Sequence, residues 1–208
     1  MTLASQLKTL AVVSACALAF GAAQAAPTVV TFTADATGAR ANGFVSGGVT
    51  FSDTNGTGLS VLDGLPVECA AAANHCLANF GDDTGALAMS FAGLQTSLSL
   101  DFGNDDPGFI PAGGLAYLQL FLGVVLVGEA STVVNQDDIM NQTVSYSGAA
   151  FDNAVFAYTD GSKVRVRLIE VVDNITYDNA NAVPQPASLA LVGLALAGLG
   201  VASRKRKA

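Results

Sequence analysis

The sequence predicts an all-β domain, an antiparallel β-sandwich, between two hydrophobic end segments. Three observations support this fold class. Apolar and polar residues alternate with a period of two in several short runs, and residues 98–102 are the clearest case. Clusters of Gly, Asp and Asn separate the runs, and the middle of the chain offers no convincing amphipathic helix. Many short strands joined by such turns are typical of a sandwich.

The first 25 residues have the pattern of a secretory signal peptide. A positive charge precedes an apolar stretch that ends near Phe20, and Ala23-Gln24-Ala25 matches a small-residue cleavage site. We therefore expect residues 1–25 to be removed and the mature chain to begin at Ala26. A lipoprotein signal with Cys16 as the acylated residue is the alternative, and both interpretations imply export.

Residues 26–182 are enough for one domain with its own core. They contain all 17 acidic residues of the chain against four bases, a net charge of −13. A surface this acidic repels phosphate groups, so nucleic-acid binding is excluded as a function. The same charge should attract cations.

Ten segments of this region have the alternation or composition of short strands. In chain order they are residues 30–33, 44–51, 86–91, 97–102, 115–121, 124–127, 143–146, 154–158, 163–168 and 174–177. Turn sequences such as Asp53-Thr54-Asn55-Gly56 and Thr159-Asp160-Gly161 separate them. The Ala-rich segment 67–78 is the one stretch with helical composition, and we expect a loop or a single turn there.

Cys69 and Cys76 are the two cysteines of the mature domain. In the oxidising compartment that export implies, we expect a disulfide between them, closing a loop that contains His75. This bridge should stabilise the fold by about 2 to 3 kcal/mol on the chain-entropy estimate. A zinc site from the same three residues is the alternative, but adjacent His and Cys ligands fit one ion poorly and a fourth soft ligand is missing.

His75 is the only histidine of the chain, and no nucleophile motif surrounds it. We expect an exposed loop histidine and no enzyme. Paired carboxylates of a glycosidase are the remaining catalytic option, and they would require a measured separation and a raised pKa.

One acidic turn gathers side-chain oxygens of the kind that Ca²⁺ prefers. Its residues are Asp101, Asn104, Asp105 and Asp106. The spacing is not that of an EF-hand, so solvated turn acids are the alternative to a calcium site. The pairs Asp82-Asp83 and Asp137-Asp138 have the same two interpretations.

Three bases, Lys163, Arg165 and Arg167, share one face of a predicted strand. We expect them to pair with acids on a neighbouring strand. A small site for acidic sugars is the alternative.

The C-terminal 26 residues fall into three parts: Val183-Pro184-Gln185-Pro186, an uncharged run at 187–202, and a basic tail at 203–208. As a helix the run covers about 24 Å, short of the roughly 30 Å bilayer core, and it spans if the lipid thins. The positive-inside rule keeps the tail bases in the cytoplasm and places the domain outside. These bases are Arg204, Lys205, Arg206 and Lys207.

This arrangement resembles the PEP-CTERM sorting signal of Gram-negative bacteria, in which a Pro-Glu-Pro motif, a hydrophobic segment and a basic end are processed by an exosortase. Here Gln185 stands where the family usually carries Glu. The resemblance implies a transient exosortase partner, an inner-membrane-anchored intermediate, and a final location in the cell envelope or outside the cell.

A weaker resemblance covers the body of the chain. Residues 98–106 and 172–177 are similar to strands of the jelly-roll-like domains that many PEP-CTERM proteins carry. The resemblance implies a jelly-roll-like sandwich whose closing Asp-Asn strand helps to bind calcium or carbohydrate. The chain has no Trp, and its four Tyr all lie in predicted strands, so carbohydrate binding rests on this resemblance.

The leading expectation is a non-enzymatic surface or extracellular-matrix protein linked to exopolysaccharide or biofilm. The second is a carbohydrate- or calcium-binding module, with Ca²⁺ as the one cofactor considered. The third is a secreted glycoside-active enzyme. Expected partners are the exosortase, extracellular polysaccharide, and the membrane through residues 187–202 before processing.

Overall fold

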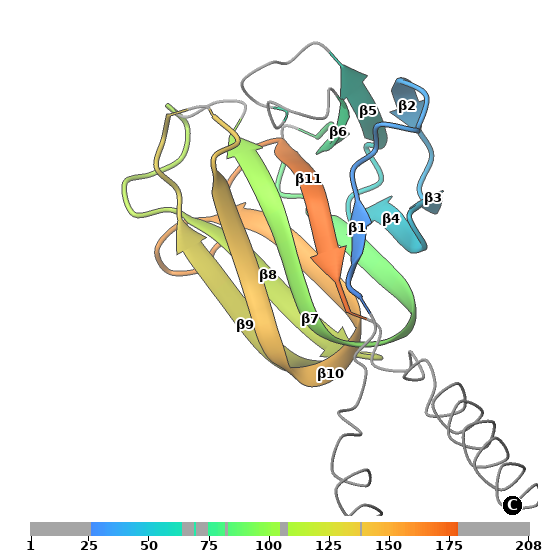
Figure 1. Cartoon of the computed structure of the whole chain (residues 1–208). Helices are drawn as coiled ribbons and strands as arrows, with labels where there is room; N and C mark the ends of the chain where they lie inside the picture. Colours follow the sequence, from blue (N-terminus) through green and yellow to red (C-terminus); the bar gives the residue numbers. More distant parts are fainter. Residues whose placement is uncertain are drawn as a thin grey trace, which may run out of the picture. The chain divides into compact units, whose positions relative to one another are not determined.

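All regular secondary structure that the computed structural model describes is β. The described residues are 26–63, 69, 75–81, 83–104, 108–137 and 139–178, and they form eleven strands (Figure 1). In chain order the strands are β1 (Thr28–Val30), β2 (Gly38–Arg40), β3 (Phe44–Ser46), β4 (Val49–Asp53), β5 (Leu59–Asp63), β6 (His75–Asn79), β7 (Leu87–Asn104), β8 (Leu115–Leu122), β9 (Val125–Val133), β10 (Gln142–Thr159) and β11 (Glu170–Tyr177).

The expected signal peptide, membrane helix and basic tail lie outside the described residues. Within the described ranges, no helix has the length and apolar character needed to cross a bilayer.

Period-two sequences set the faces of the strands. In β4 the side chains of Val49 and Phe51 are fully buried, whereas those of Thr50 and Ser52 point the other way and are partly exposed. One face of β4 therefore packs in the core and the other face meets solvent.

The strands pair in the order β2-β5-β6-β11-β7-β10-β8-β9, and β1, β3 and β4 attach at the side. Every strand pairing in the described residues is antiparallel. The all-β antiparallel fold predicted from the sequence is therefore confirmed.

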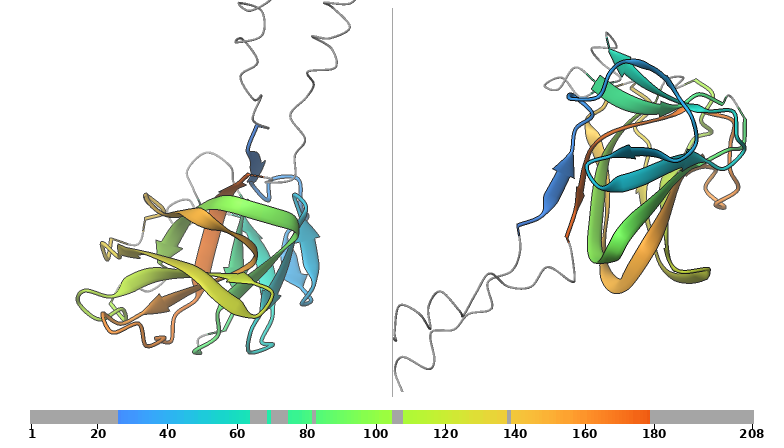
Figure 2. Two further views of the ribbon diagram at one scale, coloured as in Figure 1. Left: turned by 90° about the horizontal axis from the view of Figure 1, so that it is seen from below. Right: turned by 90° about the vertical axis from the view of Figure 1, so that its right-hand side faces the viewer.

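Two 18-residue strands, β7 and β10, belong to both layers of the sandwich. The first part of β7 pairs with β4, and its second part pairs with β11. Along β10 the register with β7 shifts between Ser147 and Phe151 and again between Phe151 and Asn153. Such irregularities bend a strand, and the right-hand view of Figure 2 shows both strands curving at one end of the domain.

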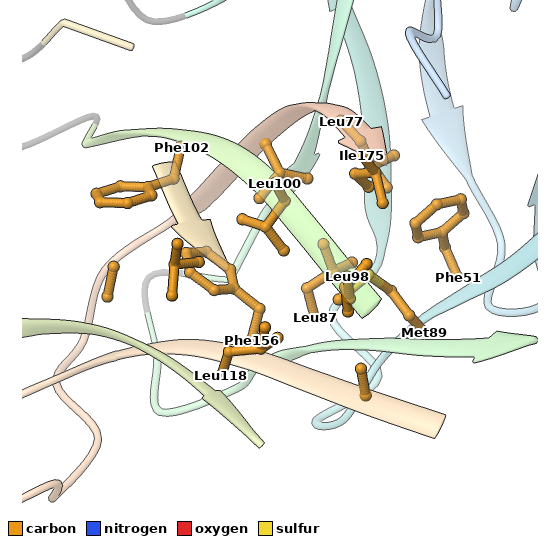
Figure 3. Close-up of a cluster of buried hydrophobic side chains, with 14 of the residues drawn as sticks. Phe51, Leu77, Leu87, Met89, Leu98, Leu100, Phe102, Leu118, Phe156 and Ile175 are labelled. Carbon is orange, nitrogen blue, oxygen red and sulfur yellow. The ribbon is translucent and has the colours of Figure 1, made fainter. Parts of the chain in front are cut away.

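The core lies between the layers and is built from aliphatic and aromatic side chains (Figure 3). Leu98 and Leu100 of β7 are at most 1% exposed, and Phe102 packs edge-on against Tyr158. The buried Tyr158 hydroxyl donates a hydrogen bond to the Gly103 carbonyl. The core thus ties β7 to β10 at the end of the domain where Asp101 lies.

The predicted strand at 163–168 is wrong. The chain makes an isolated bridge between Thr159 and Arg165 there, and Lys163 has a left-handed φ of 65°. The Asp160 carboxylate accepts hydrogen bonds from the backbone N–H groups of Ser162 and Val164, at 2.8 and 2.9 Å. These hydrogen bonds stabilise a turn at residues 160–164, so the segment does not pair as a continuous strand.

Other strand predictions need smaller corrections. Residues 44–51 form a hairpin, β3 and β4, because Gly47 and Gly48 have φ values of 54° and 82° that favour a turn. The segments 143–146 and 154–158 are parts of one strand, β10. Strands β2 and β5 were not predicted, and part of the expected loop at 67–78 is strand β6.

Candidate cation-binding site

Two carboxylates face each other where β7 and β11 pair. Asp101 and Asp173 are direct partners in the antiparallel ladder, so their side chains lie on the same face. Asp173 is 0% exposed, whereas Asp101 is half-buried. Because like charges directly opposite each other destabilise a sheet, this pair needs a compensating partner.

The carboxylate of Asp173 has two unsatisfied oxygen atoms. Neither Oδ1 nor Oδ2 has a hydrogen-bond partner in the described part of the chain, although buried carboxylates are normally paired or hydrogen-bonded. Burial raises the pKa of Asp173 to about 6; the charge of Asp101 adds to the rise, while the Asn174 backbone and the charge of His75 oppose it. The surroundings of Asp173 therefore disfavour its charged form when no compensating positive charge is present.

Asp101 is held by donors from both neighbouring strands. The Thr143 hydroxyl donates to Oδ1 at 2.5 Å, and the Asn174 side-chain amide donates to Oδ2 at 2.9 Å. The ladder is interrupted between Asp173 and Thr176, and Asn174 has a left-handed φ of 49°. This bulge brings the Asn174 side chain to Asp101.

The predicted calcium turn is only partly described. Asp105 and Asp106 lie outside the described residues, as does the side chain of Asn104. No group of three or more His, Cys, Asp or Glu side chains within the described ranges lies close enough together to hold a metal ion. Calcium at this turn therefore stays a prediction, with Asp101 as its described member.

Asp173 entered the expectations only as part of the closing Asp-Asn strand that the resemblance implies, and the structure places it opposite Asp101. It follows the apolar pair Val171 and Val172 in β11, a strand that is central in the sheet. A charged side chain at such a position is rarely buried without a partner.

The cysteine pair lies on strand β6 and the segment before it. The sulfur atoms of Cys69 and Cys76 are 2.02 Å apart, as in the expected disulfide, and both residues are buried. His75 is not the exposed loop residue that we expected: it begins β6, is half-buried, and its Nδ1 lies 3.2 Å from the Phe32 carbonyl oxygen. Strand pairing of β6 with β5 and β11 accounts for this burial.

One of the three bases makes the expected cross-strand ion pair, from a turn rather than a strand. Lys163 Nζ lies 2.6 Å from Glu129 Oε2 of β9 and 4.8 Å from the centre of the Tyr117 ring. The Tyr117 hydroxyl donates to the same carboxylate. The hydrogen bond from Lys163 is the main cause that lowers the pKa of Glu129.

The chain is similar to one protein of known structure. A protein of the DUF4465 family from Bacteroides caccae ATCC 43185 has a crystal structure with a TM-score of 0.44 and 12% identity, covering 74% of this chain and 100% of that chain. No curated protein matched the chain.

The C-terminal segment has a family match. Residues 182–207 match the family described as the PEP-CTERM protein-sorting motif. The match includes Val183, Pro184, Gln185 and Pro186 and the four tail bases, which lie outside the described residues. The chain therefore carries a PEP-CTERM sorting motif, the signal of an exported protein that an exosortase sorts.

Proposed function

We propose that this exported chain is delivered to the cell envelope or the extracellular matrix, where its acidic β-sandwich has a non-catalytic, structural or adhesive role beside exopolysaccharide. The observation that carries this proposal is the sorting motif at residues 182–207. A disulfide-linked, antiparallel domain is compatible with the oxidising environment outside the cell.

The geometry supports a non-catalytic role. Asp101 and Asp173 are close enough in the ladder to resemble a carboxylate pair of a glycosidase. Asp173 is fully buried, however, so a sugar could not reach it. His75 lies against the Phe32 carbonyl, and the sulfur of the adjacent Cys76 is bonded to Cys69.

Cell fractionation tests the proposal. The full chain, expressed in a host that contains an exosortase, should reach the surface or the medium, and a variant lacking residues 183–208 should not be retained and processed in the same way. The same chain in a host without exosortase should accumulate in the membrane fraction. Equal distribution in all three cases would contradict the proposal.

A calcium-binding module is the second candidate, and the unpartnered carboxylate of Asp173 favours it. A hard cation bound between Asp101 and Asp173 would remove the repulsion across β7 and β11. Millimolar CaCl₂ should then raise the melting temperature of the chelator-treated chain by several degrees through mass action. Asp173→Asn should abolish the shift; no shift for the unmodified chain would remove this candidate.

A further inference from the structure

The outer face of one layer contains a pocket that takes no part in the carboxylate site. Its volume is about 270 Å³, and it lies over β4, β7 and β10 and the end of β8. The side chains that matter for its chemistry are those of Thr50, Ser52, Ser90, Phe121, Asn153 and Val155.

Strand register aligns these residues in rows. Thr50 pairs with Ser90, Ser90 pairs with Asn153, and Asn153 pairs with Phe121, so one row crosses four strands. At about 4.8 Å between strands, the row is roughly 14 Å long. All four side chains are at least partly exposed, because their chain neighbours such as Phe51 and Met89 occupy the core face.

Part of the pocket is held in place before any ligand binds. The Asp152 carboxylate accepts hydrogen bonds from the Gly123 backbone N–H at 2.8 Å and from the Asn153 side-chain amide at 2.7 Å. Asn153 therefore has a fixed orientation, which lowers the entropic cost of binding. The Thr50 and Ser90 hydroxyls make no hydrogen bond within the described part of the chain and are available to a ligand.

The lining is uncharged although residues 26–182 have a net charge of −13. An acidic ligand is repelled by this domain, and a basic protein would be drawn to the acids rather than to this surface. Hydroxyl and amide groups beside a partly exposed Phe121 ring suit a ligand that presents both hydroxyl groups and apolar C–H faces. A neutral polysaccharide has this chemistry.

We infer that this face, the Thr50–Ser90–Asn153–Phe121 row, binds a segment of neutral polysaccharide with one sugar ring against Phe121. The inference rests on the proposed location outside the cell and names the partner there. The aromatic ring that contacts the sugar is therefore a phenylalanine. Tyr117, Tyr158 and Tyr177 are at most 8% exposed and are too buried for this role.

The test uses the full chain, purified in detergent, against immobilised neutral glucans, galactans and mannans, with a uronate-containing acidic polysaccharide beside them. Two variants change the row: Phe121→Ala, and the double variant Thr50→Val with Ser90→Ala, which removes two hydroxyls and keeps strand-compatible side chains. The matched control is Phe109→Ala, since Phe109 is a 74% exposed ring that does not line the pocket. Circular dichroism and thermal melting establish that each variant folds.

We expect binding to at least one neutral polysaccharide, at least tenfold weaker in both row variants and unchanged in Phe109→Ala. The inference is overturned if no neutral polysaccharide binds, if both folded row variants bind as the unmodified chain does, or if only the acidic polysaccharide binds. Sedimentation that shows dimers dissociated by Phe121→Ala, without glycan binding, would instead assign the face to a second copy of the chain. Because cell fractionation measures sorting separately, a negative glycan result leaves the proposed delivery standing.

Discussion

Two buried acids of the core, Asp173 and Glu170, differ in their hydrogen bonding. Asp173 has no hydrogen-bond donor for its carboxylate in the described residues, whereas Glu170 Oε2 accepts a hydrogen bond from Asn79 Nδ2 at 3.0 Å. Both lie on β11, which pairs with β6 and β7. Each makes the stability of the fold depend on pH.

Asp173→Asn should stabilise the calcium-free chain at neutral pH. Because the pKa of Asp173 is raised from 3.8 to about 6 in the folded state, the unfolded chain loses this proton first and stability falls as pH rises from about 4 to 6. The amide removes a penalty of about 3 kcal/mol at pH 7 and can donate to Asp101. Urea unfolding at pH 4 and pH 7 measures it; an equal effect at both pH values would contradict the assignment.

Glu170→Gln should flatten the pH dependence at higher pH. Burial raises the pKa of Glu170 from 4.5 to about 8, although the hydrogen bond from Asn79 lowers it in part. The protonated, neutral form is therefore the stable one in the fold, and stability is lost as pH rises from about 4.5 to 8. Unfolding curves between pH 5 and 9 should slope downward for the unmodified chain and be shallower for the variant.

At the scale of elements, the bends of β7 and β10 allow one sheet to form both layers. The bend of β10 includes Gly148, and Tyr146 packs its ring over Gly128 of β9. A Cβ at Gly128 would overlap the Tyr146 ring. This glycine is required by packing between β9 and β10, not by its backbone conformation.

Gly128→Ala should therefore destabilise the domain by about 1 to 3 kcal/mol, since the Tyr146 ring must move. Gly108→Ala is the matched control because a Cβ there meets nothing within 4 Å. Thermal melting of the two variants compares them directly. Equal melting temperatures would show that the ring adapts at no cost.

Loss of the bridge between Cys69 and Cys76 should lower the free energy of unfolding by about 2 to 3 kcal/mol, because the unfolded chain regains the entropy of a short loop. The variant with both residues changed to Ser and the reduced protein should agree. Thiol titration of the folded, non-reduced chain should find these two sulfurs unreactive. Two free thiols in exported protein would contradict the bond.

The sequence predicts strands best where alternation is clean and turns are strong. Residues 97–102 were assigned correctly because one face is buried and the other is partly exposed, whereas 115–121 is an apolar run that is buried on both faces near Tyr117. The alternation at 163–168 predicted a strand, but a turn forms there because the Asp160 carboxylate accepts hydrogen bonds from two backbone N–H groups. Strand β6 was missed because it follows the Ala run at 70–73 and because its own sequence, His-Cys-Leu-Ala-Asn, has no alternation. Its place comes from pairing with β5 and β11.

In the candidate sites, the sequence indicates single residues, and only the strand register shows which residues lie together. Asp101 was selected because it begins an acidic turn, but its partner Asp173 is 72 positions away and the ladder alone brings the two together. The Phe121 row combines four strands, none of which has a distinctive motif. Long-range register is the information that a single sequence does not supply.

At the scale of the whole molecule, the chain joins an acidic sandwich to a C-terminal sorting motif. The sorting motif accounts for export and sorting, and the sandwich is a folded domain with an uncharged pocket and a carboxylate pair. The charge of −13 for residues 26–182 also keeps copies of the domain apart at low salt.

Intact-mass analysis of the protein recovered from the surface or medium of an exosortase-containing host measures whether the chain is exported and processed at both ends. We expect a chain shortened at both ends, beginning at Ala26 and lacking the peptide Arg204-Lys205-Arg206-Lys207, with Cys69 bonded to Cys76. An unprocessed 208-residue chain with free thiols, found in the cytosol, would contradict this expectation.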